Sequence, residues 1–317
     1  MSLIAPKVRT IDAVRDVTFQ VEPGELLAFI GPNGAGKSTT IKMLTGILHP
    51  SCGEARVLGF VPWRQRRELA FHIGSVFGQR SQLWMHLPPQ DSFRLLGRIY
   101  EVPDRDHHRR IAKMAELFDL GELLTTPVRK LSLGQRMRCE IAASLLHSPR
   151  VIFLDEPTIG LDVIAKQKIR DLILTANAEE GMTIFLTSHD AGDIEKLCKR
   201  VIIIDRGQLL MDASVQALKR SEHFTLRTIG VRMSRPVESF EMEGVEILKK
   251  KGPGMKLQVD GARVPVESVI RRLMEFGHLE DISVRMPSLE EIIARIYREK
   301  GLPGAPPEAT ADDGEEP

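Results

Sequence analysis

The chain has 317 residues, about twice the usual length of a single domain, so one large and one smaller domain are expected. Its hydrophobic fraction of 42% and charged fraction of 27% are those of a globular protein and exclude a largely disordered chain. The 44 basic and 43 acidic residues nearly cancel, which excludes nucleic acid as a partner bound through a strongly basic charge overall.

Apolar runs alternate with amphipathic stretches through the first 220 residues. Residues 13–30 predict two strands separated by a Pro-Gly turn, and residues 39–48 predict a helix. Further buried strands, with helices between them, are expected at 151–154, 183–186 and 201–204, and the helices at 164–180 and 190–198. This alternation predicts an α/β fold, with a parallel sheet that is covered by helices on both faces.

Two other regions differ from this pattern. Residues 80–148 show helical periodicity without a strand, at 92–100, 106–118 and 133–147, which predicts a helical subdomain inserted between strands. From 221 to 300, alternating residues, a turn at 249–254, a helix at 265–277, a strand at 282–284 and a Ser288-x-x-Glu291 capping box predict a small α+β module. Residues 301–317 are rich in Pro, Gly and acids and predict a disordered tail. The expected domains are therefore 1–220, 221–300 and this tail.

A glycine-rich loop follows the predicted strand 26–30 and precedes the predicted helix. Its residues fit the phosphate-binding pattern GxxxxGK[ST] and are Gly31, Pro32, Asn33, Gly34, Ala35, Gly36, Lys37 and Ser38, with Thr39 next in the chain. In this pattern the glycines let backbone amides surround a phosphate, and the helix dipole adds positive potential. Lys37 would place its charge on the β- and γ-phosphate oxygens, and Ser38 would ligate Mg²⁺. The sequence therefore predicts a P-loop nucleotide site.

Two acids end the predicted strand 151–154. Asp155 and Glu156 lie where α/β sheets place ligand chemistry, at the carboxyl end of a buried strand. Such a pair alone more often caps the next helix, but beside a P-loop a role in phosphoryl chemistry is favoured. Asp155 would hold Mg²⁺ through water, and Glu156 would polarise the attacking water.

A third motif narrows the class of protein. Leu131-Ser132-Leu133-Gly134-Gln135 resembles the LSGGQ signature of ATP-binding cassette (ABC) proteins, with Leu133 in place of the first glycine. The resemblance covers about residues 10–220 and implies ATP and Mg²⁺ as cofactors. It also implies that Ser132, Gly134 and Gln135 contact the nucleotide bound to the other subunit of a head-to-tail dimer. The dipole of the helix that begins at this loop agrees with such a contact.

Further landmarks of the ABC family follow in the family's order. Residues 75–79 resemble the Q-loop, which implies that Gln79 contacts Mg²⁺ and water; because Gly78 precedes it, Gln82 is the alternative. Gly160-Leu161-Asp162 resembles the D-loop, so Asp162 is expected to couple the two sites of the dimer. Thr187-Ser188-His189 resembles the H-switch, in which a neutral imidazole of His189 contacts the γ-phosphate and orients the water or the general base.

One landmark of the family is missing. Residues 1–18 contain no Phe, Tyr or Trp to stack on adenine. Val8, Ile11 or Val14 would pack against the base with less stacking energy. ATP binding is still expected, with weaker selectivity for the base.

The resemblance also implies what the cassette drives. A single cassette without a membrane span implies permease subunits on separate chains, and residues 83–89, with Trp84 and Met85, lie where transporter cassettes receive the permease's coupling helix. The motifs further resemble a bacterial subgroup of multidrug-exporter-like ATPases. The resemblance thus predicts an exporter ATPase that acts as a dimer, a homodimer being feasible because this chain holds both halves of a site. The alternative is a soluble single-cassette ATPase of macromolecular or cofactor assembly.

The cysteines bear on the compartment. Cys52, Cys139 and Cys198 are widely spaced and form no CxxC pair. An odd set of isolated cysteines is typical of reduced thiols in the cytosol. We therefore expect a cytoplasmic protein that is peripheral on the inner face of the membrane through its permease.

Overall fold

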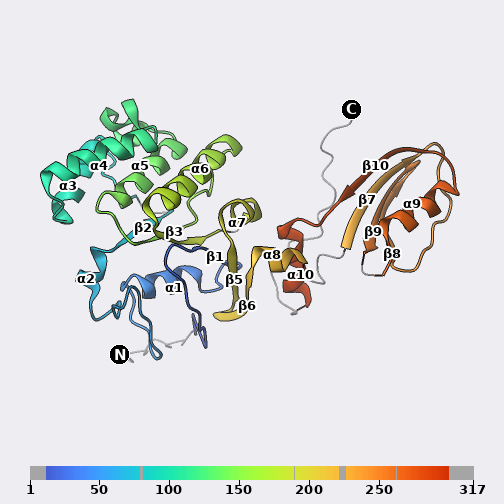
Figure 1. The fold of residues 1–317 in the computed structure, drawn as a ribbon, viewed down its shortest axis with the longest axis horizontal. Coiled ribbons are helices and arrows are strands. Elements are labelled where there is room, and N and C mark those ends of the chain that lie inside the picture. The colour runs from blue at the N-terminus through green and yellow to red at the C-terminus, as the bar shows by residue number, and fades with distance from the viewer. Residues whose placement is uncertain (1–11, 79–80, 189, 221–225, 262, 300–317) are drawn as a thin grey trace, which may run out of the picture. The chain divides into compact units, whose positions relative to one another are not determined.

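The chain forms two compact units, Met1–Ala213 and Ser214–Pro317, in a computed structural model (Figure 1). The structure describes residues 12–78, 81–188, 190–220, 226–261 and 263–299. The expected tail, 301–317, lies outside the described residues. The sequence places its domain boundary after residue 220, and that assignment of domains stays a prediction.

A six-stranded sheet forms the centre of the first unit. Its strands lie in the order β2 (Ile73–Phe77), β3 (Val151–Asp155), β4 (Thr183–Thr187), β1 (Leu26–Ile30), β5 (Arg200–Asp205) and β6 (Gln208–Ser214). The pairs β2–β3, β3–β4, β4–β1 and β1–β5 are all parallel. The strand β6 follows β5 after the two-residue turn Arg206-Gly207, in which both residues have positive φ. The predicted α/β fold with a parallel sheet is confirmed.

The strands are buried on both faces because their apolar runs are continuous. The residues of β1 and β4 are all buried, and the ring of Phe185 packs against those of Phe29 and Phe153, with centroid distances of 5.2 and 5.5 Å. Phe19 adds a fourth ring, 5.6 Å from Phe29. The strand expected before the Pro23-Gly24 turn is wrong: residues 17–22 form no strand, although Phe19 and Val21 pack against the core, and among the described residues no strand pairs with them.

Helices cover the sheet on both sides, with α1 on one side and α5 and α6 on the other (Figure 1). The helices α1 (Lys37–Leu44), α6 (Val163–Glu180) and α7 (Ala191–Leu197) each follow a strand of the sheet, and α2 (Arg66–Ala70) lies between α1 and β2. Between β2 and β3 the described residues form helices and no strand, namely α3 (Pro89–Ile99), α4 (Asp104–Leu117), the 3₁₀ turns η1 (Gly121–Thr125) and η2 (Val128–Lys130), and α5 (Leu133–Leu145).

The first helix is shorter than the sequence predicts. It begins at Lys37 rather than Thr39 and ends at Leu44 rather than Leu48. Gly46 has a φ of +73°, a left-handed conformation that ends the helix, and the amides of Ile47 and Leu48 turn back to Lys42 O at 2.8 and 2.9 Å.

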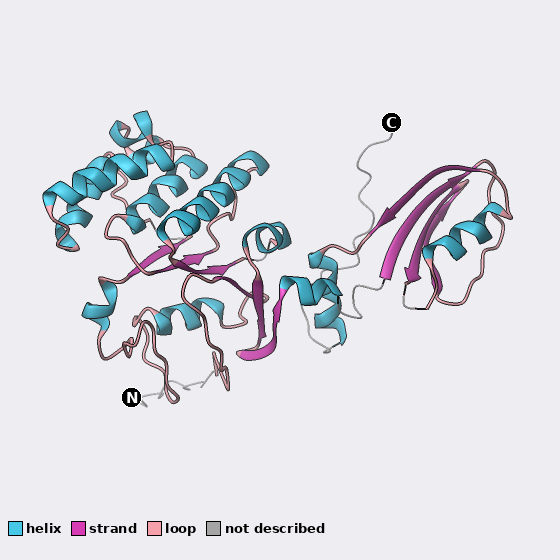
Figure 2. Cartoon of the chain, viewed as in Figure 1, coloured by secondary structure: helices cyan, strands magenta, loops and turns pink. Residues whose placement is uncertain are grey.

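The second unit has a four-stranded antiparallel sheet with a helix on one face (Figure 2). Its strands lie in the order β10 (Leu279–Arg285), β7 (Leu226–Met233), β9 (Gly254–Asp260) and β8 (Val245–Lys251). The helix α9 (Val266–Met274) packs Val269 and Leu273 on the inward residues of β7 and β9. Two further helices are α8 (Val215–Arg220) and α10 (Leu289–Glu299). The predicted capping box opens α10: the amide of Ser288 donates to Glu291 Oε2 at 2.8 Å, and the amide of Glu291 donates to Ser288 Oγ at 3.2 Å.

Candidate nucleotide-binding site

The predicted phosphate loop joins β1 to α1 with a tightly packed backbone. Gly34 and Gly36 have φ of +81° and +104°, which favour glycine. A Cβ at Gly31 would lie 2.3 Å from Ile204 O, and one at Gly36 would lie 2.5 Å from Ala13 O. No side chain caps the first turn of α1, so its amides are available to an anion. The glycines therefore keep the start of α1 open for a phosphate.

Lys37 folds back over the loop. Its side chain is buried, and Nζ donates to Gly31 O at 2.7 Å and to Pro32 O at 3.2 Å. Burial lowers the pKa of Lys37, while the carboxylates of Glu156 and Asp155 act in the opposite direction. The ammonium thus contacts the loop carbonyls and interacts electrostatically with two acids, in the loop where a phosphate would bind.

We expect Lys37→Ala to weaken ATP binding about 10- to 100-fold, since a hydrogen bond to a charged group contributes about 1.5–3 kcal/mol. Calorimetric titration with ATP measures the loss. Lys42→Ala is the matched control, because Lys42 is an exposed lysine of the same helix. Unchanged affinity in Lys37→Ala would contradict the assignment of the phosphate loop.

Asp155 connects the phosphate loop to the neighbouring strand β4. Its Oδ2 accepts a hydrogen bond from Ser38 Oγ at 3.0 Å, and its Oδ1 accepts one from Thr187 Oγ1 at 2.6 Å. Ser38 and Asp155, which the sequence names as metal ligands, therefore meet across 117 residues of chain. A hydroxyl and a carboxylate are oxygen donors of the kind that Mg²⁺ prefers, so these residues fit that ion. The contact of Thr187 with Asp155 was not predicted, although Thr187 ends a buried strand in the same way.

Glu156 adopts a strained backbone conformation directly after β3. Its φ is +54°, and its amide donates to both Thr187 O and Thr187 Oγ1 at 3.1 Å. A non-glycine residue in this region carries a cost of order 1–3 kcal/mol, which the surrounding contacts must offset. The turn places the glutamate beside Asp155 and within electrostatic reach of Lys37.

Gly78 is needed where β2 approaches the two acids. Its amide donates to Asp155 O at 3.0 Å. A Cβ at this position would lie 2.9 Å from Asp155 O and 3.0 Å from Glu156 O. The glycine that precedes Gln79 in the sequence therefore lets the chain leave β2 close to the acid pair.

The signature residues form the start of α5. Ser132 and Gln135 form a capping box: the amide of Gln135 donates to Ser132 Oγ at 3.2 Å, and the amide of Ser132 donates to Gln135 Oε1 at 2.9 Å. Leu133 packs over Gly160, where an added Cβ would lie 3.2 Å from Leu133 Cδ2. A Cβ at Gly134 would lie 3.0 Å from Ala165 Cβ. The residue that replaces a glycine of the motif thus packs against the D-loop.

Asp162 has a structural role within this chain. Its Oδ1 accepts a hydrogen bond from the amide of Ala165 at 2.8 Å and so caps the start of α6. The expected contacts of Asp162, Ser132, Gly134 and Gln135 with a second cassette stay predictions.

Two predicted site residues, Gln79 and His189, lie outside the described residues. Gln82, the alternative to Gln79, is bound to α5: its Nε2 donates to Glu140 O at 2.8 Å. Of the residues expected at adenine, Val8 and Ile11 also lie outside, and Val14 lies beside Gly36, 3.2 Å from an added Cβ there.

Glu140 is a buried acid that the sequence analysis missed. It is 4% exposed, and its carboxylate accepts hydrogen bonds from Ser81 Oγ and, at 3.2 Å, from the amide of Gln82. Burial raises the pKa of Glu140 despite these hydrogen bonds. An acidic residue within a helical stretch, 137–146, that is otherwise mostly apolar is the signal that could have found it. Glu140 attaches the signature helix to the segment that follows the Q-loop.

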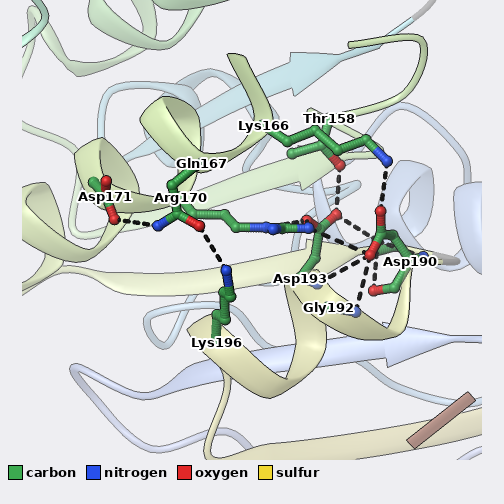
Figure 3. A network of polar contacts seen from close by, with 10 residues as sticks. Thr158, Lys166, Gln167, Arg170, Asp171, Asp190, Gly192, Asp193 and Lys196 are labelled. Carbon is green, nitrogen blue, oxygen red and sulfur yellow. Dashed lines mark hydrogen bonds and ion pairs between the residues drawn. The ribbon is translucent and has the colours of Figure 1, made fainter. Parts of the chain in front are cut away.

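A buried ion network surrounds the segment that contains the H-switch (Figure 3). Asp193 is fully buried and accepts from Arg170 Nε at 2.6 Å, from Ser188 Oγ at 2.8 Å and from Thr158 Oγ1. Beside it, Asp190 pairs with Lys166 at 2.5 Å and with Arg170 at 3.3 Å. Ser188 and Asp190, the neighbours of His189 in the chain, are therefore fixed to α6 and to the turn after Glu156.

These features define a P-loop ATPase: a phosphate loop between strand and helix, a buried lysine, and an acid pair at the end of a parallel strand. Comparison with known proteins narrows this class. Residues 14–159 match the family model "ABC transporter". The chain is 32% identical over 216 residues to the ABC transporter ATP-binding protein NatA of Bacillus subtilis (strain 168), a match that covers 68% of this chain and 87% of NatA. The chain therefore belongs to the ABC transporter ATP-binding proteins.

Two further comparisons extend this result. The chain is 29% identical over 290 residues to the daunorubicin resistance ATP-binding protein DrrA3 of Streptomyces coeruleorubidus, which covers 90% of each protein. A solved dimeric ATP-binding cassette in a post-hydrolysis state, bound to ADP and Pi, superimposes with a TM-score of 0.58 at 25% identity. That match covers 65% of this chain and 91% of the solved chain. Among the described helices, none has the length and hydropathy that crossing a bilayer requires.

Proposed function

We propose that this chain is the ATP-hydrolysing subunit of an ABC exporter and acts on permease subunits encoded on separate chains. The observation that carries the hydrolytic part is the contact between Ser38 and Asp155, with Lys37 and Glu156 beside it. It places a cation, a hydroxyl and two carboxylates at the start of α1, where a triphosphate and its metal would bind.

Each residue of the site has a defined task in hydrolysis. The amides at the start of α1 and the ammonium of Lys37 bind the β- and γ-phosphates. Ser38 and Asp155 would hold Mg²⁺, which would supply positive charge to offset the negative charge of the phosphates. Glu156 accepts a proton from water as the water attacks the γ-phosphorus and the bond to the β-phosphate oxygen breaks. Gln79 and His189 are proposed to contact the metal's water and the γ-phosphate.

The complete site is proposed to need two cassettes. Residues 31–39 of one subunit and 132–135 of the other would enclose each ATP, so binding closes the dimer and hydrolysis reopens it. The solved cassette that this chain resembles is a dimer bound to ADP and Pi, which supports this arrangement. Two copies of this chain suffice for it, because the chain carries both the phosphate loop and the signature.

An exposed apolar loop supports a membrane partner. In residues 83–89, here called the Trp84 loop, the side chains of Trp84, Met85 and Leu87 are 41%, 37% and 45% exposed. Their backbone is nevertheless held: Trp84 N donates to Ser92 Oγ at 3.2 Å, Arg129 N donates to Met85 O at 2.9 Å, and Val128 N donates to Leu87 O at 3.1 Å. A rigid backbone that presents large apolar side chains is typical of a docking surface. We propose that it receives a cytoplasmic helix of the permease.

The direction of transport is proposed from the relatives' names. DrrA3 is named for daunorubicin resistance, and its similarity extends over 90% of this chain, including the second unit. A cassette of this kind would drive outward movement of a compound that the permease selects.

The experiment that tests the proposal is affinity capture of tagged protein from detergent-solubilised membranes of the native host, followed by mass spectrometry. A multi-span protein in stoichiometric amount is expected. Trp84→Asp should lose it while keeping the ATPase activity of the purified chain. Ile47→Asp is the matched control, because it places the same charge at an apolar side chain that is 44% exposed.

Other outcomes would overturn the transport role. Recovery of soluble partners alone, with the chain absent from membranes, would favour an assembly ATPase and make the Trp84 loop a surface for a soluble partner. Equal recovery of a multi-span protein with Trp84→Asp would place the docking surface elsewhere.

A further inference from the structure

The sheet of the second unit has a face that α9 does not cover. Because side chains alternate along a strand, the residues between the buried ones point to this second face. The register aligns Gly230 of β7 with Ser283 of β10 and Lys256 of β9, and it aligns Arg232 with Asp281 and Gly254. On β8, Lys249 lies opposite Lys256 and Lys251 lies opposite Gly254.

A hollow of about 310 Å³ lies on this face. Gly230 and Gly254 lie diagonally on the neighbouring strands β7 and β9, so two positions of its floor carry no side chain. Neither glycine has the positive φ that would require glycine for the backbone. At Gly230 the requirement is space, since a Cβ would lie 2.7 Å from Ser283 Oγ. The hollow therefore exists because these two strand positions carry glycine, not because the backbone there is unusual.

Four cations line the hollow: Arg232, Lys249, Lys251 and Lys256. Within the described part of the chain, no hydrogen bond or ion pair of their side chains is found, although Asp281 lies on the same face. Lys250, between two of them, instead donates from Nζ to Glu238 O at 2.6 Å. Like charges this close repel one another, so the face lowers its energy when an anion binds.

We propose that this hollow binds a small, soluble, multiply charged phosphate compound. Four cations and one carboxylate leave a net charge that suits a diphosphate, and Ser283 Oγ adds a neutral donor. No aromatic ring lines the hollow, so it lacks the stacking surface with which sheet faces bind bases of RNA. The apolar lining residues Val231 and Met255 belong to the core beneath α9, so the lining of the hollow offers no free apolar side chain to an acyl chain.

The test is a calorimetric titration of the full-length chain with inorganic pyrophosphate. The Lys37→Ala substitution is present in every variant, which weakens phosphate binding at the P-loop and keeps it equal among them. Saturable binding at a single site is expected. The double substitution Lys249→Gln with Lys256→Gln should lower the affinity for pyrophosphate at least about tenfold, since two charges close to the ligand are lost. Arg263→Gln with Arg271→Gln removes the same charge from exposed positions outside the hollow and should leave the affinity unchanged.

A second variant separates a shaped site from a charged surface. Gly254→Val keeps all four cations and places a side chain in the hollow, where ordinary strand geometry accepts a β-branched residue. It should weaken pyrophosphate binding about as much as the loss of the two lysines. Circular dichroism and the urea midpoint verify that each variant is folded.

Three results would overturn the proposal. The first is no binding of pyrophosphate at millimolar concentration, and the second is equal weakening by the arginine control. The third is that the chain binds phosphatidylglycerol vesicles or single-stranded RNA but not pyrophosphate, and that this binding depends on the same two lysines. This face would then be a membrane or RNA surface. None of these results bears on ATP hydrolysis in the first unit. The outcome of this test is therefore independent of the proposed transport role.

Discussion

Glu156→Gln is expected to abolish steady-state ATP hydrolysis while ATP binding is kept. The amide has the shape of the carboxylate but cannot accept the proton of the attacking water, and loss of a general base lowers the rate about 10²–10⁴-fold. The hydrogen bonds of its backbone amide with Thr187 do not involve the carboxylate, so they are retained in the variant. Phosphate release measures turnover, and calorimetric titration measures ATP binding.

The same variant is expected to accumulate the closed dimer, because ATP stays unhydrolysed between the two subunits. Light scattering with and without ATP and Mg²⁺ detects the change in mass. Glu179→Gln, an exposed glutamate at the end of α6, is the control and should behave as the native chain. Undiminished hydrolysis in Glu156→Gln would place the general base at another residue.

The largest loss of stability in the first unit is expected from Asp193→Ala. The fully buried carboxylate accepts from Arg170, Ser188 and Thr158, and its removal leaves the guanidinium of Arg170 inside the protein with only the longer contact to Asp190. Breaking a buried ion pair from one side costs about 3–5 kcal/mol. The free energy of unfolding from a urea titration should fall by that amount.

An exposed ion pair provides the comparison for Asp193→Ala. Asp106 pairs with Arg109 on the surface of α4, where such a pair contributes about 0–1 kcal/mol, so Asp106→Ala should change the free energy of unfolding little. If Asp193→Ala lowers stability no more than Asp106→Ala does, the network contributes little to the fold. A folded Asp193→Ala chain should also hydrolyse ATP more slowly than the native chain, since the hydroxyl of Ser188 beside the H-switch loses the shorter of the two hydrogen bonds that it donates and keeps only the one to Asp190 O at 3.5 Å.

The phosphate loop and the strand acids could be predicted from the sequence because their information is local. Within Gly31–Ser38, residue types and spacing specify both the backbone conformation and the ligand. The parallel sheet was predictable for a similar reason, since each buried strand is a short continuous apolar run. The end of α1 also has a local signal, which is Gly46. The apolar residues Ile47 and Leu48 after it nevertheless favoured the prediction of a helix that extends to residue 48.

Other features depend on pairings that no local pattern encodes. Asp193 and Arg170 are 23 residues apart, and Ser81 and Glu140 are 59 apart, so neither contact follows from spacing. The alternation at 17–21 indicates a strand, yet within the part of the chain that the structure describes no strand pairs with its backbone. Likewise the run Lys249–Lys251 predicts a turn in the sequence, whereas it ends β8, and only the register of the sheet brings two of its lysines beside Lys256.

Glu140 links the Trp84 loop to the helix α5 in the first unit. Its carboxylate and carbonyl hold Ser81 and Gln82, the residues just before the Trp84 loop, and it belongs to the helix that begins with the signature. Pulling this connection apart would leave a buried acid without its hydrogen bonds, at a cost of about 1–3 kcal/mol or more. We therefore expect the loop and α5 to move together, so that a displacement of Trp84 also displaces Ser132–Gln135.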